Sequence, residues 1–95
     1  MQPGPNQCNI LVYLHDVRGQ EVGSVRVVAY MTNSVARVMR EACNHFHVQL
    51  SRYNVRTGIL DLDDFDGTVQ QIDPNMQPNV TVHVDMWPKS IDDCF

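Results

Sequence analysis

The chain has 95 residues and a mass of 10.8 kDa, which is the size of one small domain. It carries 7 basic and 11 acidic residues, which gives a net charge of -4 and a pI near 5.3. This acidic balance argues against a generic nucleic-acid binder, because such a protein needs a basic surplus to neutralise phosphates. No stretch approaches the ~20 apolar residues of a membrane span, and the first residues lack a signal peptide's charged start and apolar run. We therefore expect neither nucleic acid nor a membrane among its partners.

The three cysteines, Cys8, Cys43 and Cys94, are an odd number and form no Cys-x-x-Cys motif. A secreted domain of this size normally carries paired cysteines as disulfides. The pattern therefore predicts free thiols in a reducing, cytoplasmic compartment. Cys43 falls on an apolar helical face, where it acts as a small hydrophobe, whereas Cys8 and Cys94 are expected in the two tails.

The first third of the chain predicts a β-hairpin behind a flexible leader, residues 1–8. Residues 9–16 alternate, with Ile10, Val12 and Leu14 on one face, and residues 21–31 are rich in Val and Tyr. Gly19 lies in the intervening turn, where it is free to adopt positive φ. The two runs are therefore expected to pair as adjacent strands.

One amphipathic helix is expected from about Ser34 to His47. Thr32, Asn33 and Ser34 are consecutive N-cap candidates, and histidines near the end suit the negative end of the helix dipole. Six apolar side chains recur on one stripe at helical spacing. They are Val35, Val38, Met39, Ala42, Cys43 and Phe46.

The second half predicts two further strands. Residues 52–57 form a short candidate closed by Gly58, and residues 61–67 form an acidic turn. Residues 80–86 alternate, with Val80, Val82 and Val84 on one face. Trp87-Pro88 is expected to end this strand, which places the domain at residues 9–87 and an acidic tail at 88–95.

The element order predicts an α+β architecture: a mixed sheet of roughly four or five strands with one main helix packed on one face. The last strand belongs beside the first, in the middle, because these two have the cleanest apolar runs. This order resembles the ubiquitin-like β-grasp superfamily from about Asn9 to Met86. The resemblance lies in the hairpin turn at Arg18-Gly19, the helix opened by Ser34-Val35, the segment from Arg52 to Gly58, the turn from Asp64 to Val69, and the strand from Val80 to Val84.

Two departures separate the chain from conjugated modifiers. Met86-Trp87-Pro88 stands where a modifier has its Gly-Gly ending, and Lys89 is the only lysine. The resemblance therefore implies an embedded, non-conjugating module that binds another protein, as an adaptor or scaffold domain, for example of the cytoskeleton. We expect it to be the N-terminal part of a larger intracellular protein.

The sequence favours no catalytic or metal chemistry. The acidic run has Leu62 where a calcium loop begins with Asp, and residues two apart on a helix, such as Cys43 and His45, point about 200° apart. No serine lies in a Gly-x-Ser-x-Gly context, and no glycine-rich phosphate loop is present. The expectation is a protein that is not an enzyme, with no cofactor and no metal.

The sheet face away from the helix is the predicted partner-binding surface. Alternation directs two tyrosines, an arginine, two aliphatic residues and two histidines to this face, and Tyr and Arg are residue types that interfaces favour. The predicted centre is Tyr13, Tyr30 and Arg26. The full predicted set is Leu11, Tyr13, His15, Arg26, Val28, Tyr30 and His83.

An alternative is self-assembly, with weak self-association through charge. Residues 18–56 hold six Arg and two Glu, a net charge of +4, whereas residues 57–95 hold eight Asp and one Lys, a net charge of -7. Oppositely charged sides can associate head to tail. Asp64, Asp66 and Gly67 resemble the acidic loop of the Phox-and-Bem-type subgroup, although His15 stands nearest its first-strand lysine. The alternative docking loop is Asp61, Asp63, Asp64 and Asp66.

Overall fold

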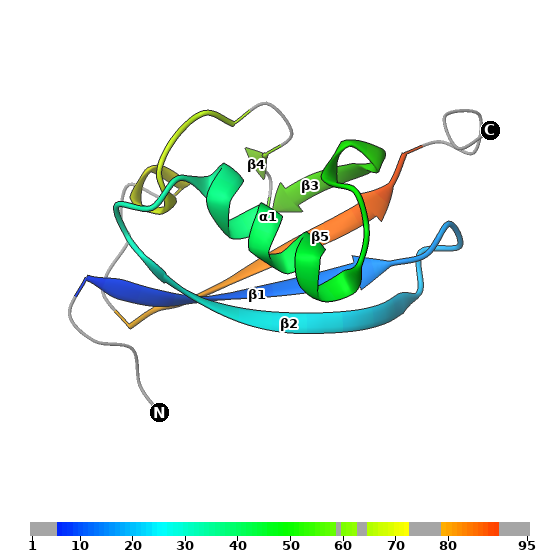
Figure 1. Ribbon diagram of the computed structural model, residues 1–95, viewed down its shortest axis with the longest axis horizontal. Helices are drawn as coiled ribbons and strands as arrows, with labels where there is room; N and C mark the ends of the chain where they lie inside the picture. The colour runs from blue at the N-terminus through cyan, green and yellow to red at the C-terminus, as the bar shows by residue number, and fades with distance from the viewer. Residues whose placement is uncertain (1–5, 59, 63–64, 73–78, 90–95) are drawn as a thin grey trace.

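The computed structural model describes residues 6–58, 60–62, 65–72 and 79–89 (Figure 1). Its strands and helices follow in the order β1, β2, α1, η1, β3, β4, η2, β5. The strands are β1 (Gln7–His15), β2 (Glu21–Tyr30), β3 (Tyr53–Thr57), β4 (Leu60–Asp61) and β5 (Thr81–Pro88). The α-helix is α1 (Val35–Phe46), and two short 3-10 helices are η1 (Leu50–Arg52) and η2 (Val69–Ile72).

The described strands form one five-stranded sheet in the order β2-β1-β5-β3-β4. The first and last strands lie side by side and run parallel, from the pair Asn9 and Thr81 to the pair Leu14 and Met86. All other neighbouring strands are antiparallel. The sheet is therefore mixed, and α1 lies across one of its faces (Figure 1), as the sequence predicts.

The hairpin turn is held by the side chain of Asp16. Its carboxylate accepts hydrogen bonds from the backbone N–H groups of Arg18 (2.9 Å) and Gln20 (3.0 Å). Gly19 has φ of +83°, the left-handed region that side-chain-bearing residues adopt at a cost. These contacts confirm the predicted turn and fix the register of β1 against β2, which shifts once, between Leu14 and His15.

Both ends of α1 agree with the predicted helix. The Ser34 hydroxyl accepts a hydrogen bond from the Arg37 N–H as N-cap, and His47 ends the helix in the left-handed conformation with its N–H donated to the Cys43 carbonyl. Five of the six stripe residues are buried, and Phe46 is half-buried. The stripe therefore packs on the sheet, where it covers the inward side chains of the central strands.

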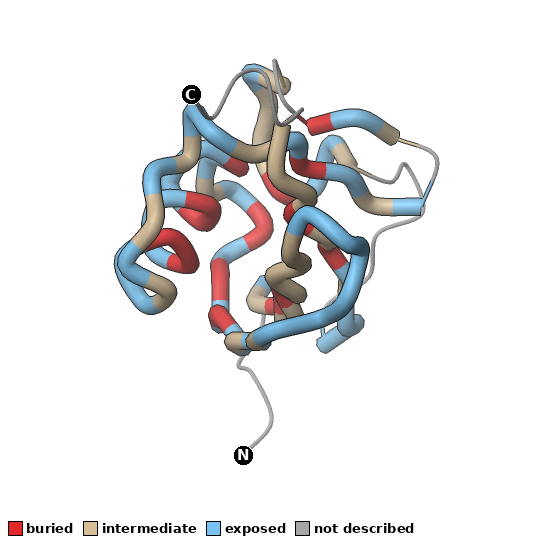
Figure 2. The backbone as a smooth tube through the Cα atoms, turned by 90° about the vertical axis from the view of Figure 1, so that its right-hand side faces the viewer, coloured by how far each residue is buried: buried red, intermediate tan, exposed pale blue. Residues whose placement is uncertain are grey.

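The core lies between α1 and the inner sheet face (Figure 2). Inward side chains come from alternate residues of β1, β2 and β5, with Met86, Val12 and Cys8 fully enclosed. About 25 cal/mol per Å² of buried apolar surface makes this layer the main source of stability. Below the start of the helix, the Val35 N–H donates to the Gly67 carbonyl and the Val69 N–H to the Asn33 carbonyl, which ties the second half of the chain to the first.

Several predicted boundaries and faces were wrong. β1 begins at Gln7, inside the predicted leader, and Cys8 is buried in the core instead of lying in a tail. β5 begins at Thr81, so Val80 lies before it and is exposed, whereas Val82 is half-buried and Val84 is buried. Trp87 and Pro88 continue β5 because β3 pairs with them.

The acidic turn contains structure that the sequence did not reveal. Leu60–Asp61 forms the edge strand β4, and the Leu62 N–H donates to the Val55 carbonyl at 2.7 Å. η2 follows, with its first residue, Val69, buried. Arg52, predicted as the first residue of a strand, ends η1 instead.

Candidate functional site

The outer face of the sheet is the side that α1 leaves uncovered. Its side chains come from the odd-numbered residues of β1 and β5 and the even-numbered residues of β2, which alternate with the buried positions. The alternation places all seven predicted partner-binding residues here. They are Leu11, Tyr13, His15, Arg26, Val28, Tyr30 and His83.

Tyr13 and His83 form a cross-strand pair in the middle of this face. The Tyr13 hydroxyl and His83 Nδ1 share a hydrogen bond of 2.9 Å, and the two rings stack with centroids 5.7 Å apart. The Thr57 hydroxyl donates to the backbone carbonyl of His83 at 2.7 Å, which joins β3 to the same point. The hydrogen bond and the stacking therefore hold the two rings in one relative orientation.

His15 belongs to a second cross-strand cluster, with Asp85 and Trp87. Its Nε2 donates to the Asp85 carboxylate at 2.9 Å, and its ring stacks on the indole of Trp87 with centroids 3.7 Å apart. The His15 side chain is 11% exposed and that of Asp85 39%. The histidine is thus enclosed by its neighbours, and Trp87 and Asp85 form more of the local surface than the sequence prediction assumed.

Sequence reasoning missed Trp87 because Pro88 was expected to end the last strand before it. Asp85 was placed on this face but not in the site. The alternation of His83, Asp85 and Trp87 was the signal that could have found both. Two polar side-chain atoms of the described residues are buried without a hydrogen-bond partner: His15 Nδ1 in this cluster and Asn9 Oδ1 near the other end of β1.

The register of β1 against β2 and β5 separates the predicted partner-binding residues into groups. Leu11 is opposite Arg26 on β2 and His83 on β5, so these three side chains are neighbours. Tyr13 is opposite Ser24, whereas Tyr30 is opposite Gln7 at the other end of the hairpin. Six strand positions separate Ser24 from Tyr30, about 20 Å at ~3.3 Å per residue.

The outer face therefore has two parts. A central part, Tyr13, His83, Leu11 and Arg26, lies over β1 and its neighbours, and an apolar end on β2 is formed by Val28 and Tyr30. These last two side chains are 50% and 54% exposed. Tyr13 and Tyr30, which were predicted to lie together with Arg26 at the centre of this face, are therefore separated along the hairpin.

The acidic loop is described in part. Asp61 in β4 and Asp66 are exposed, while Asp63 and Asp64 lie outside the described residues. A Cβ on Gly67 would come within 2.8 Å of the Phe65 ring and 2.5 Å of Gln71 Oε1. These close contacts explain why a glycine occupies position 67, without reference to a binding partner.

Cys43, His45 and His47 are close in sequence but do not form a metal-binding group in the structure. Cys43 is buried, whereas His45 and His47 are exposed, and the described residues contain no group of three or more His, Cys, Asp or Glu side chains that could hold a metal ion.

Cys8 and Cys43 are free thiols, and burial raises the pKa of each above the ordinary value of 9.0. Within the described part of the chain, no helix is long and apolar enough to cross a membrane.

No family model matches the chain, and no curated protein matches it in sequence. Among solved structures it is similar to a de novo designed protein based on ubiquitin, with a TM-score of 0.64 and 16% identity. The similarity covers 92% of this chain and 94% of the designed one. The molecule therefore has a ubiquitin-like β-grasp fold, which confirms the predicted fold class. Whether it is an embedded, non-conjugating module or is related to the Phox-and-Bem-type subgroup stays a prediction.

Proposed function

We propose that this chain is a protein-interaction module that binds a partner protein through the outer sheet face, in an adaptor or scaffold role and without catalysis. The observation that carries the proposal is the pair of ordered ring clusters on this uncovered face, Tyr13 with His83 and His15 with Trp87. Amphipathic rings fixed in place offer broad contact area at low entropic cost on binding.

The chemistry around the rings also supports a protein partner. Arg26 is exposed beside Leu11, and Val28 and Tyr30 extend the surface along β2. Aromatic residues and Arg are enriched in the binding hot spots of protein interfaces. The two described thiols are free and buried, which fits a reducing, cytoplasmic setting.

The alternative is a head-to-tail oligomer in which the acidic loop of one copy meets the Arg-bearing face of the next. Asp61 and Asp66 are exposed in the acidic second half of the chain, and Arg37 and Arg40 are exposed on α1 in the basic segment. Such an oligomer would dissociate steeply with salt, because exposed charges are screened beyond about 10 Å at ~0.1 M ionic strength.

The test is quantitative capture from cell extract with three immobilised variants. A Tyr13→Ala, Arg26→Ala double variant removes the central contact, and Asp61→Asn, Asp66→Asn neutralises the two described loop carboxylates. Arg37→Ala on the exposed side of α1 is the matched control, since it removes a surface arginine away from the outer face. A partner retained by the wild type and Arg37→Ala, and lost from the double variant, supports the proposal.

Two results would contradict it. Equal capture by Tyr13→Ala, Arg26→Ala would remove the outer face from the binding reaction. Loss in the loop variant and weakening in Arg37→Ala, with capture kept by Tyr13→Ala, Arg26→Ala, would favour the head-to-tail oligomer if light scattering also shows a molecular mass that decreases with salt. All variants must melt cooperatively, so that unfolding is not mistaken for lost binding.

A further inference from the structure

β2 is an edge strand, because it pairs with β1 on one side only. It is ten residues long, and no described strand or helix lies beyond it (Figure 1). The opposite edge strand, β4, has two residues. Natural proteins commonly protect a sheet edge by keeping the strand short or by placing lysine or proline in it, and β2 contains neither residue. Its free side therefore offers main-chain hydrogen-bonding groups to another strand.

The hydrogen-bond pattern shows which residues of β2 direct their main chain to the free edge. The Met31 N–H donates to the Asn6 carbonyl, which continues the register of β1 against β2. Every second residue of an antiparallel strand bonds to a given neighbour, so the odd-numbered residues before Met31 bond to β1. The even-numbered residues direct their N–H and C=O groups outward, and within the regular part of the strand they are Ser24, Arg26 and Val28.

Both ends of this free edge are closed. The outward N–H of Tyr30 donates to Asn33 Oδ1 at 2.9 Å, and the Tyr30 carbonyl accepts from the Asn33 N–H at 2.9 Å. At the other end the register against β1 shifts opposite His15, so the regular run begins after Val22. The open run is therefore residues 24–28.

We propose that two copies of this chain pair through β2, antiparallel and about a two-fold axis at Val25, so that their two sheets become one. A two-fold axis brings the same edge of each copy together. In this register Ser24 of each copy lies opposite Arg26 of the other, and the outward main-chain groups of these residues form about four hydrogen bonds. The occupant of the edge is a second copy because the open run is complementary to itself.

The side chains favour this register over its two neighbours. An axis at Arg26 would place two guanidinium groups directly opposite each other, which is destabilising. An axis at Ser24 would need Val22, at the register shift, to bond with Arg26. The axis at Val25 sets each arginine against a serine and brings Val28 opposite Val22 of the second copy. These two valines are 50% and 59% exposed in the single chain, and the pairing covers both positions.

The first experiment is sedimentation velocity over a wide range of protein concentration, combined with amide hydrogen exchange by NMR. We expect a monomer–dimer equilibrium that salt changes little, because main-chain hydrogen bonds hold the pair. The N–H groups of Ser24 and Arg26 should become protected from exchange as the dimer forms. Those of Val25 and Val27 should be protected at every concentration, because they bond to β1.

Charge changes at Ser24 test the register. Ser24→Glu places a carboxylate opposite Arg26 of the second copy and should tighten the dimer about fivefold, since the axis creates the pair twice. Ser24→Lys should weaken the dimer by a similar factor, and adding Arg26→Glu to Ser24→Lys should restore it. Ser51→Glu and Ser51→Lys, at an exposed position in η1, are the matched controls and should leave the dissociation constant unchanged.

Several outcomes would overturn the proposal. They are a monomer at every concentration, unchanged exchange at Ser24 and Arg26, or equal dissociation constants for Ser24→Glu and Ser24→Lys. A mass that grows beyond the dimer and falls steeply with salt would instead favour the head-to-tail oligomer. His83→Ala removes an outer-face ring two strands from the edge and should leave the dimer intact, so the dimer and the proposed outer-face function can fail separately.

Discussion

The imidazole of His15 lies flat on the indole of Trp87, with ring planes 8° apart and centroids 3.7 Å apart. Its Nε2 donates at the same time to Asp85. Three side chains from β1 and β5 thereby join the two central parallel strands on the outer face. We expect the stacked pair of His15 and Trp87 to contribute to stability as well as to the surface.

We expect a coupling free energy of about 1 kcal/mol between His15 and Trp87, the range measured for packed ring pairs. A double-mutant cycle of His15→Ala and Trp87→Ala, with unfolding in urea followed by circular dichroism, measures it. Asp85→Asn keeps an acceptor for the Nε2 hydrogen and should cost less than His15→Ala. Additive effects of the two ring deletions would show that the stacking contributes no stability of its own.

Val38→Asp should unfold the domain. Val38 is 3% exposed on α1, and an unpaired carboxylate buried there costs several kcal/mol of the ~5–15 kcal/mol available. Arg37→Asp introduces the same side chain at the neighbouring exposed position and should change the melting temperature little. Similar melting curves for the two variants would mean that α1 does not cover the core.

Met86→Ala should cost about 2–5 kcal/mol, because Met86 is fully enclosed in the central strand β5. Chemical denaturation with an unchanged slope against denaturant would assign the loss to stability alone. Val80→Ala, just before the same strand and at an exposed position, is the matched control. A loss under about 1 kcal/mol for Met86→Ala would place this side chain outside the core.

Gly23 and Phe46 should be energetically coupled. A Cβ at Gly23 would lie 3.3 Å from Phe46 Cε1, a tight contact at the rim of the core. Gly23→Ala should therefore destabilise by about 1 kcal/mol in the wild type and by less in a Phe46→Leu background. Because Phe46 is half-buried, Phe46→Ala should cost less than the ~3–5 kcal/mol of an enclosed phenylalanine.

Stability should fall in alkaline solution through the buried thiols. Burial raises the pKa of Cys8 and Cys43 above 9.0 in the folded chain, so the unfolded chain loses these protons first as pH rises. Their stabilising contribution is present below pH 9 and is lost as pH rises through the folded pKa. Urea unfolding across this range should show a steeper decrease in the wild type than in Cys8→Ala, Cys43→Ala, and equal slopes would contradict the assignment.

The helix and the hairpin were predictable because their signals are local. Ser34 caps α1 and Gly19 turns the hairpin through contacts within a few residues, which the sequence alone encodes. Cys8 and Val80 were misplaced because their burial depends on pairing between β1 and β5, some seventy residues apart in the chain. Tertiary pairing decides such strand ends, and alternation does not.

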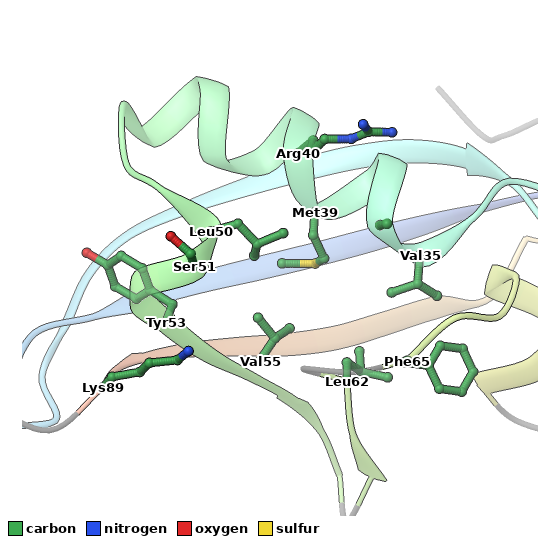
Figure 3. A pocket seen from close by; sticks show the side chains of 11 residues that line it. Val35, Met39, Arg40, Leu50, Ser51, Tyr53, Val55, Leu62, Phe65 and Lys89 are labelled. Carbon is green, nitrogen blue, oxygen red and sulfur yellow. The ribbon is translucent and has the colours of Figure 1, made fainter. Parts of the chain in front are cut away.

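The candidate site, too, could be predicted from the sequence only in part. Alternation assigned Tyr13 and Tyr30 to one face, but their separation along the hairpin follows from the register, which the turn at Asp16 sets. The pocket of about 480 Å³ between α1, η1 and β3 could not be predicted from the sequence, because Met39, Val55 and Leu62 in its lining come from segments that meet only in the folded chain (Figure 3).

The parallel contact between β1 and β5 has a consequence for synthesis on the ribosome. β1 is made first, yet one of its two edges is filled only by Thr81–Pro88, and Val84 and Met86 of that strand are among the most enclosed side chains. A nascent chain that has emerged only as far as η2 therefore exposes the unpaired edge of β1 to other chains. Chaperone binding is most needed in this interval, which closes when β5 leaves the exit tunnel.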